Sequence, residues 1–186
     1  MKKLLIVFIA FLITLFAFCA EARISLPDEA KIPALNILEN AGFESGKIKW
    51  TTNSSEFDII TTAAHVGNGN NAASYDPDAD GDYLETDAVS VANELLGKEG
   101  VACINWKGSD TNAELNVIDN NGNELKSAPL WVATSYDETC TNFIFPDKEG
   151  ATVKLRIEAE GNAAIGYYDD ALIANARRIN LKDTSS

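Results

Sequence analysis

Short runs of alternating hydrophobic and polar residues recur along most of the chain. The clearest run is Thr152 to Ala159, where apolar Val153, Leu155 and Ile157 alternate with charged residues. A period of two is typical of a strand with one buried face. Val101 to Lys107 also alternates, which predicts a strand with Ala102, Ile104 and Trp106 on one face and Cys103 and Asn105 on the other.

Further short strands are predicted wherever apolar and β-branched residues lie between turn-forming residues. They cover 35–38, 57–62, 72–75, 83–91, 115–119, 124–126, 129–135, 139–145 and 165–173. Asn120 to Asn123 contains the Asn-Gly pair of a tight hairpin, and Asn93 to Lys98 predicts a single helical turn. About ten strands with no long helix indicate an all-β sandwich or barrel.

The first residues have the composition of a targeting segment. Lys2 and Lys3 precede an apolar run of about 15 residues, Leu4 to Phe18, and small residues follow at Ala20 and Ala22. We therefore predict a signal peptide over residues 1–22, of bacterial appearance, and a mature protein secreted to the periplasm or the exterior. The alternative is a membrane anchor, but the run is shorter than the ~20 residues that span a bilayer.

The remaining chain divides into three parts. Residues 23–33 contain Pro27 and Pro33 and are interpreted as a lead-in, 34–175 as the β-sandwich domain, and 176–186 as a polar tail. Cys19 raises the alternative of a lipoprotein. Because lipoprotein processing requires a small residue before the cysteine and Phe18 is bulky, we assign Cys19 to the removed leader.

Two cysteines, Cys103 and Cys140, then remain in the mature chain. In an oxidising compartment a lone pair predicts one disulfide, closing a loop of 37 residues (140 minus 103). Two buried free thiols are the alternative. The chain carries 28 acidic against 15 basic residues. An acidic surface repels phosphate backbones, so nucleic acid is excluded as an expected partner.

Two short motifs resemble a known family. Asn40-Ala41-Gly42-Phe43-Glu44-Ser45-Gly46 followed by Trp50 resembles the opening signature of jelly-roll carbohydrate-binding modules, and Tyr168-Asp169-Asp170-Ala171-Leu172 resembles their closing strand. The resemblance covers roughly residues 34 to 175. It implies a two-sheet jelly-roll β-sandwich of the galactose-binding-like class. It also implies a non-catalytic module that binds a glycan or another cell-surface polymer.

The same resemblance implies a structural Ca²⁺ where the first and last strands meet. Carried over residue by residue, Glu44 and Asp170 are its candidate ligands, completed by backbone carbonyls. The alternative is that both are solvated turn residues. A second candidate for Ca²⁺ comes from the residues themselves, because Asp76 to Asp87 matches the spacing of a twelve-residue calcium loop, with acids at Asp76, Asp78, Asp80 and Asp87. No helix is predicted before it, so a looser acidic calcium loop and an ordinary solvated loop are the alternatives.

The sequence gives little support for catalysis. His65 is the only histidine, and no Gly-x-Ser-x-Gly elbow is present. We therefore expect a protein that is not an enzyme. For a sugar ligand, exposed aromatic rings matter most, because a flat ring can stack on a sugar face.

The candidate ligand-binding residues are Trp131 and Tyr136, which flank a polar segment, with Trp106 and Asn105 on the strand 101–107. Trp106 shares a face with Ile104, so a core position is its alternative. The sequence thus predicts a secreted glycan-binding module with one disulfide and a structural Ca²⁺. The rival hypothesis is a structural or adhesive cell-surface β-sandwich that contacts protein and has no sugar site.

Overall fold

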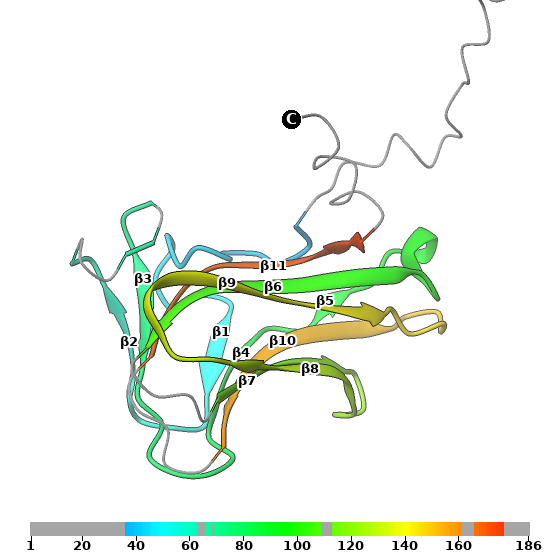
Figure 1. Ribbon diagram of the computed structural model, residues 1–186. Coiled ribbons are helices and arrows are strands. Elements are labelled where there is room, and N and C mark those ends of the chain that lie inside the picture. Colours follow the sequence, from blue (N-terminus) through cyan, green and yellow to red (C-terminus); the bar gives the residue numbers. More distant parts are fainter. Residues whose placement is uncertain (1–35, 63–65, 68, 109–112, 161–165, 177–186) are drawn as a thin grey trace, which may run out of the picture. The chain divides into compact units, whose positions relative to one another are not determined.

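The computed structural model describes residues 36–62, 66–67, 69–108, 113–160 and 166–176. They form two antiparallel sheets (Figure 1). Sheet A has the order β1-β4-β10-β7-β8, and β5 also pairs with β10. Its strands are β1 (Trp50–Thr52), β4 (Tyr83–Thr86), β5 (Val89–Ser90), β7 (Ala113–Asp119), β8 (Glu124–Leu130) and β10 (Thr152–Ala159).

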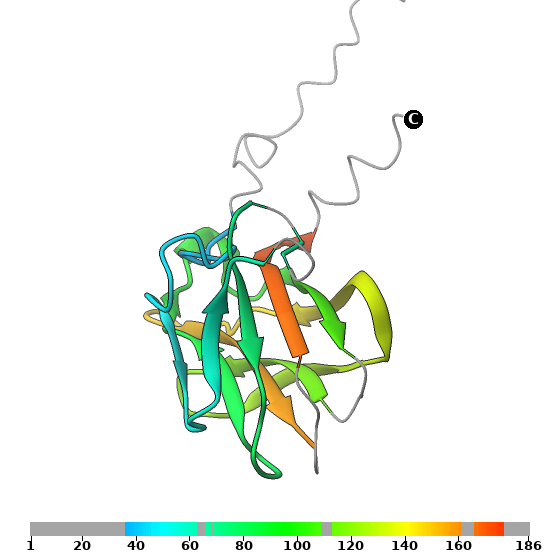
Figure 2. The same ribbon diagram turned by 90° about the vertical axis from the view of Figure 1, so that its left-hand side faces the viewer.

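Sheet B has the order β2-β3-β11-β6-β9. Its strands are β2 (Phe57–Ile60), β3 (Ala72–Tyr75), β6 (Glu99–Gly108), β9 (Ala133–Ile144) and β11 (Gly166–Asn175). Figure 1 shows the sheets as two layers, and Figure 2 shows β2, β3 and the orange β11 side by side. A 3-10 turn, η3 (Asn93–Leu95), precedes β6 where one helical turn is expected. The predicted all-β sandwich is confirmed.

The core lies between the sheets and follows the alternation in the sequence. In β10, Val153, Leu155 and Ile157 are each 0% exposed, whereas the charged residues between them are partly exposed. In β6, Ala102 and Ile104 face the same core. Burial of apolar side chains is the main favourable term in folding, so this alternation fixes which face of each strand points inward.

The hairpin between β7 and β8 is built as the Asn-Gly pair predicts. Gly122 has φ 81°, which a side chain would strain. Asp119 closes the turn, because its Oδ1 accepts hydrogen bonds from the backbone N–H groups of Asn121 and Asn123, both at 2.8 Å. These bonds, led by the one from the Asn123 side chain, lower the pKa of Asp119.

The opening and closing segments of the domain lie side by side, as their motifs predict. The Asn36 side chain donates to the carbonyl of Ala171 at 2.6 Å and accepts from the backbone N–H of Ile173 at 3.1 Å. The N–H of Ala171 in turn donates to the carbonyl of Ala41 at 3.0 Å. A bulge between Asp169 and Leu172 frees that N–H from the β6–β11 ladder.

The opening motif is a compact turn rather than a strand. Phe43 is fully buried and packs on Trp50, with ring centroids 4.5 Å apart. The Trp50 indole N–H donates to the carbonyl of Asn40 at 3.0 Å. Asn40 also donates its side-chain amide to the carbonyls of Gly46 and Ile48. Residues 36–38 make no strand, so the predicted strand at 35–38 is wrong over these described residues.

The predicted disulfide is present. Cys103 on β6 and Cys140 on β9 are direct cross-strand partners, with Cα atoms 4.1 Å apart. Their bond ties the edge strand of sheet B to its neighbour on the outer face. Over the residues that the structure describes, no helix is long and apolar enough to cross a membrane.

Candidate functional site

The outer face of sheet A carries an unbroken line of polar side chains across five strands. The pairing registers align Thr51, Glu85, Arg156, Asn116 and Ser127 from β1 to β8, and we call this line the polar row. Adjacent strands lie about 4.8 Å apart, so the row extends over about 19 Å.

Glu85 on β4 binds two cations on the outer face of sheet A. Its side chain is only 7% exposed although it points away from the core. Lys154 Nζ lies 2.6 Å from its Oε1, and Arg156 donates to its Oε2 from Nε at 3.0 Å and from Nη2 at 2.8 Å. Two cations therefore cover one carboxylate, which satisfies a charge that burial alone would penalise.

Arg156 connects the polar row to its neighbours. Its Nη1 lies 3.4 Å from the Glu158 carboxylate, and its guanidinium lies 4.2 Å from the centre of the Tyr83 ring. Such stacking is a cation–π contact. Burial lowers the pKa of Arg156, but the hydrogen bonds that Arg156 donates to Glu85 and Glu158, together with the charges of these carboxylates, outweigh it and raise the pKa overall. The charged side chains of this face are thus held in fixed positions.

Asn116 brings a buried acceptor into the polar row. It is 4% exposed, and its Oδ1 accepts no hydrogen bond from the described part of the chain. Most buried polar atoms in proteins have a partner, and exceptions call for an explanation such as a bound water, ion or ligand. The position on β7 next to Arg156 therefore has an acceptor that the described residues leave without a donor.

A second line of residues runs beside the polar row. Tyr83, Glu158, Glu114 and Pro129 are aligned across β4, β10, β7 and β8, and we call this line the carboxylate row. Pro129 lies near the end of β8, and Trp131 follows two residues later along the chain, after the fully buried Leu130, with 71% of its surface exposed. The carboxylate row therefore has an aromatic side chain at its β4 end, and an exposed one lies two residues after its β8 end.

The outer face of sheet B is covered differently. Asn105 and Tyr136 point outward there, on β6 and β9, and are partly buried. Asp169, opposite Asn105, is 0% exposed, and its Oδ2 accepts from the backbone N–H of Gly67 at 3.0 Å. A methyl group at Gly67 would lie 3.1 Å from the Tyr136 ring. The backbone at Gly67 thus packs against this face. Burial, and then the negative charge of Asp169, raise the pKa of Tyr136.

Trp106 does not belong to a binding surface. It is 1% exposed and lies between the sheets, with its ring centroid 6.4 Å from that of Tyr168. Its position on the inward face beside Ile104 puts it in the core, so the prediction that Trp106 contacts a ligand is wrong. The polar segment between Trp131 and Tyr136 is not a turn, because β9 begins at Ala133 and runs through Tyr136.

Glu44 and Asp170, the predicted Ca²⁺ ligands, have different neighbours. Glu44 Oε1 accepts from the backbone N–H groups of Asn70 at 2.7 Å and Asn71 at 3.1 Å, and these bonds, the Asn70 bond first, lower the pKa of Glu44. Asp170 lies beside Gly42, where a methyl group would lie 3.4 Å from its Oδ1. Asp170 adopts φ 46°, an unusual conformation at the bulge of β11.

The prediction that Asp76, Asp78, Asp80 and Asp87 form one twelve-residue calcium loop is wrong. Asp87 follows the extended strand β4 and lies 3.8 Å from Lys49, so it cannot close a loop with Asp76, Asp78 and Asp80 at the other end of that strand. Asp82 instead accepts from the backbone N–H groups of residues 78 and 79. The one cluster of metal-ligating types among the described residues is Cys103, Cys140 and Glu138, and its two sulfurs are bonded to each other.

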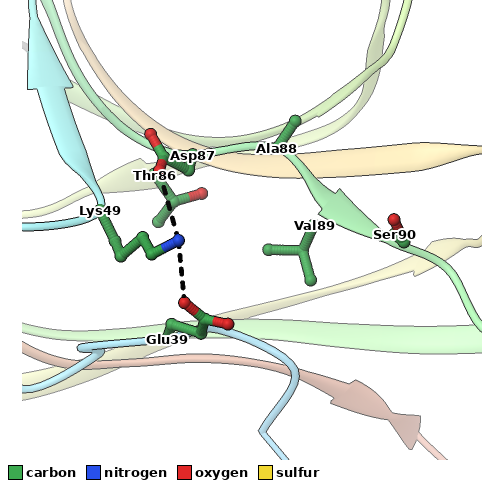
Figure 3. Close-up of a pocket in the computed structure, with 7 residues that line it drawn as sticks. All are labelled: Glu39, Lys49, Thr86, Asp87, Ala88, Val89 and Ser90. Atoms are coloured by element: carbon green, nitrogen blue, oxygen red, sulfur yellow. Dashed lines mark ion pairs between the residues drawn. The ribbon is translucent and has the colours of Figure 1, made fainter.

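A pocket of about 320 Å³ lies between the opening segment and the β4–β5 corner (Figure 3). Lys49 crosses it, with Nζ 3.0 Å from Glu39 and 3.8 Å from Asp87. The hydrogen bond that Lys49 donates to Glu39 is the main cause that raises the pKa of Lys49. Lys49 pairs with both carboxylates, so we assign this pocket a structural role in joining the opening segment to sheet A.

Several solved structures share the fold of this chain, although no family model and no curated protein matches it. TmCBM61 in complex with β-1,4-galactotriose matches with a TM-score of 0.57 and 19% identity, covering 76% of this chain and 99% of that one. The family 22 carbohydrate-binding module of Clostridium thermocellum Xyn10B matches with a TM-score of 0.53 and 13% identity, covering 73% and 91%.

A family 16 carbohydrate-binding module gives a TM-score of 0.57 at 13% identity, over 75% of this chain and all of that one. The fold is that of carbohydrate-binding modules. A match to an α-L-arabinofuranosidase covers only 26% of the enzyme chain, so the modules are the better counterparts. At these identities the likeness establishes the fold and leaves the ligand to be argued from the residues.

On this carbohydrate-binding-module fold, sequence reasoning identified one exposed aromatic residue and missed the aligned side chains of sheet A. That residue is Trp131, which is 71% exposed and follows β8 directly. Tyr83, Glu85, Asn116 and Arg156 were missed. The sequence does show that Arg156 is one of the charged residues that alternate with apolar ones in 152–159. This pattern predicts that Arg156 points outward, but it does not show which residues of β4 and β7 lie next to it.

Proposed function

We propose that this chain is a non-catalytic binding module that holds a glycan across the outer face of sheet A. The observation that carries the proposal is the alignment of polar side chains over five strands, which includes the Asn116 oxygen that accepts no hydrogen bond from the described residues. Sugar hydroxyls both donate and accept hydrogen bonds, which suits a surface of carboxylate, guanidinium and amide groups. The fold of the solved neighbours supports the same class of ligand.

Aromatic rings would define the ends of the bound glycan. Trp131 offers an exposed ring for stacking on a sugar face, and Tyr83 offers a second ring held by Arg156. From Tyr83 to Pro129, three strand spacings of about 4.8 Å give about 14 Å, and Trp131 follows Pro129 by two residues. A glycan that reaches both rings would pass over Glu158 and Glu114.

Binding to a panel of soluble oligosaccharides tests this proposal, with affinities measured by titration calorimetry. Replacing an aromatic platform costs about 1–3 kcal/mol at sites where a flat ring stacks, so Trp131→Ala should weaken binding about tenfold or more. Tyr136→Ala is the matched control on sheet B and should bind like the unaltered chain. Loss of binding in Tyr136→Ala with Trp131→Ala unaffected would move the site to sheet B.

We also propose that Ca²⁺ stabilises the seam between the opening segment and β11. Carboxylate oxygens are the donors that Ca²⁺ prefers, and those of Asp169 and Asp170 both lie beside Gly42, at 3.6 and 3.4 Å from the position of a methyl group there. Asp170 is therefore the better-supported ligand. Glu44 would have to share its carboxylate with the N–H groups of Asn70 and Asn71.

We further propose that the chain acts outside the cytoplasm. The Cys103–Cys140 disulfide supports this, because such bonds persist in oxidising compartments. Alkylation of thiols in the protein as isolated from its native compartment tests the point. Modification of both cysteines without prior reduction would contradict it.

A further inference from the structure

The carboxylate row places two like charges directly opposite each other. Glu114 on β7 and Glu158 on β10 are register partners at the centre of sheet A. Like charges in this position destabilise a sheet. Glu158 gains a partial offset from Arg156 at 3.4 Å. For Glu114, no ion pair with a cation is found within the part of the chain that the structure describes. Among the described residues, therefore, no cation pairs with Glu114 to offset its repulsion from Glu158.

The outward side chains of this face have an excess of negative charge. Five carboxylates lie on or beside the outward positions of β4, β10, β7 and β8: Glu85, Glu114, Glu124, Glu158 and Glu160. The two cations among them, Lys154 and Arg156, are both bound to Glu85. Burial, and then the charges of Glu160, Glu124 and Glu158, raise the pKa of Glu114. The end of the face around Glu114 is therefore a region where positive charge is favoured.

Asn116 adds an independent indication of a ligand. It lies two residues along β7 from Glu114, on the same outward face, and is 4% exposed with an Oδ1 that accepts no bond from the described residues. Carboxylate oxygens and an amide oxygen are all acceptors. The group that satisfies them must be a donor, and an ammonium group donates three hydrogen bonds while carrying the charge that the carboxylates lack.

Trp131 supports the same choice. Its ring is 71% exposed, and it follows Pro129 of the carboxylate row by two residues in the chain. A tryptophan face attracts cations as well as the apolar face of a sugar. A glycan that carries ammonium groups would use both properties, which a neutral glycan would not.

We propose that this face takes a glycan with free amino groups, such as an oligomer of unacetylated glucosamine, with an ammonium group between Glu114 and Glu158. This inference rests on the proposed function, since it names the class of glycan bound at the same face. The net charge of −13 at pH 7 also favours approach of a cationic polymer. The bound ammonium groups would relieve the repulsion between the two carboxylates.

Three β-1,4-linked tetramers that differ only at C2 test the proposal: glucosamine, N-acetylglucosamine and glucose. At about pH 6, where carboxylates are ionised and primary amines protonated, the glucosamine tetramer should bind about tenfold more tightly than the other two. Because the extra affinity is electrostatic, it should fall as salt is raised from about 20 to about 300 mM, while binding of the glucose tetramer stays constant. The salt series needs no variant.

Glu114→Gln removes one charge with little change in shape, and it should reduce the preference for glucosamine to about threefold or less. Glu138→Gln, an exposed site on β9 in sheet B, is the matched control and should keep the full preference. Equal affinity for glucosamine and glucose tetramers, or a preference that survives Glu114→Gln, overturns the amino-sugar inference and leaves the glycan-binding proposal standing. Absence of binding to these tetramers and to a wider glycan panel overturns both.

Discussion

Removal of the charge of Glu85 is the sharpest test of how the outer face of sheet A is held together. Glu85→Gln keeps the shape of the side chain but replaces one carboxylate oxygen with an amide group. That change removes the negative charge facing Lys154 and Arg156 and turns one acceptor into a donor. The two cations then lose the carboxylate that currently holds them, at 2.6 and 2.8 Å.

The burial of the three side chains sets the size of the effect. Breaking a fully buried ion pair costs about 3–5 kcal/mol, and breaking an exposed one costs about 0–1 kcal/mol. Glu85 is 7% exposed, but Lys154 and Arg156 are 32% and 23% exposed, so both cations can regain water. We therefore expect a loss of about 2 kcal/mol in the free energy of unfolding, which is about thirtyfold in the folding equilibrium constant.

Urea unfolding monitored by tryptophan fluorescence measures this loss, with the change taken from the midpoint at constant m-value. Glu158→Gln is the matched control, because Glu158 is 35% exposed and lies 3.4 Å from the same arginine. It should cost less than about 1 kcal/mol. If Glu85→Gln and Glu158→Gln have equal effects, or both have none, the central role of Glu85 is refuted.

Three further predictions concern the frame of the domain. Cys103→Ala with Cys140→Ala opens a loop of 37 residues and should lower the free energy of unfolding by about 4 kcal/mol relative to the oxidised chain; an equal stability under oxidising and reducing conditions would contradict this. Asn36→Ala removes its bonds to the backbone of β11 and should cost about 2 kcal/mol, against less than about 0.5 kcal/mol for the exposed Asn142→Ala. Ca²⁺ at about one hundred times its Kd should add about 2.7 kcal/mol. Asp170→Asn should abolish that gain, whereas a gain that persists in Asp170→Asn would place the ion elsewhere.

Local patterns predicted the strands well where burial alternates. Thr152 to Ala159 was predicted with its final bounds because every second residue is apolar and the strand lies at the centre of sheet A. The hairpin at Asn120 to Asn123 was predicted because Gly122 must adopt positive φ. The cysteine pair was predicted because the mature chain offers no other partner. Each of these depends on residues close in sequence or on a single possible pairing.

The candidate face depends instead on the registers between strands. Glu85 and Arg156 are 71 residues apart in the chain and meet only because β4 pairs with β10. Asn116 joins them only because β7 pairs with the other edge of β10. Period-two alternation shows that each side chain points outward, but it gives no register between strands. Sequence reasoning could therefore find the outward faces without finding the row.

In the opening segment, the local sequence pattern predicts a strand over residues 35–38 that is absent from the described residues 36–38. Instead, Asn36 and Asn40 satisfy backbone groups with their side chains, and Phe43 turns inward with φ 56°. Side-chain bonds of this kind replace a strand ladder, and propensity alone cannot reveal them. The segment nonetheless meets β11 as the paired motifs predicted.

A chemical-shift titration of the ¹⁵N-labelled chain with its best-binding oligosaccharide tests the central claim most directly. The account predicts that the largest changes fall on the backbone amides of Tyr83, Glu85, Asn116 and Arg156 and on the indole N–H of Trp131, all on the outer face of sheet A. Changes centred on Asn105 and Tyr136 of sheet B, with those of sheet A unmoved, would contradict it.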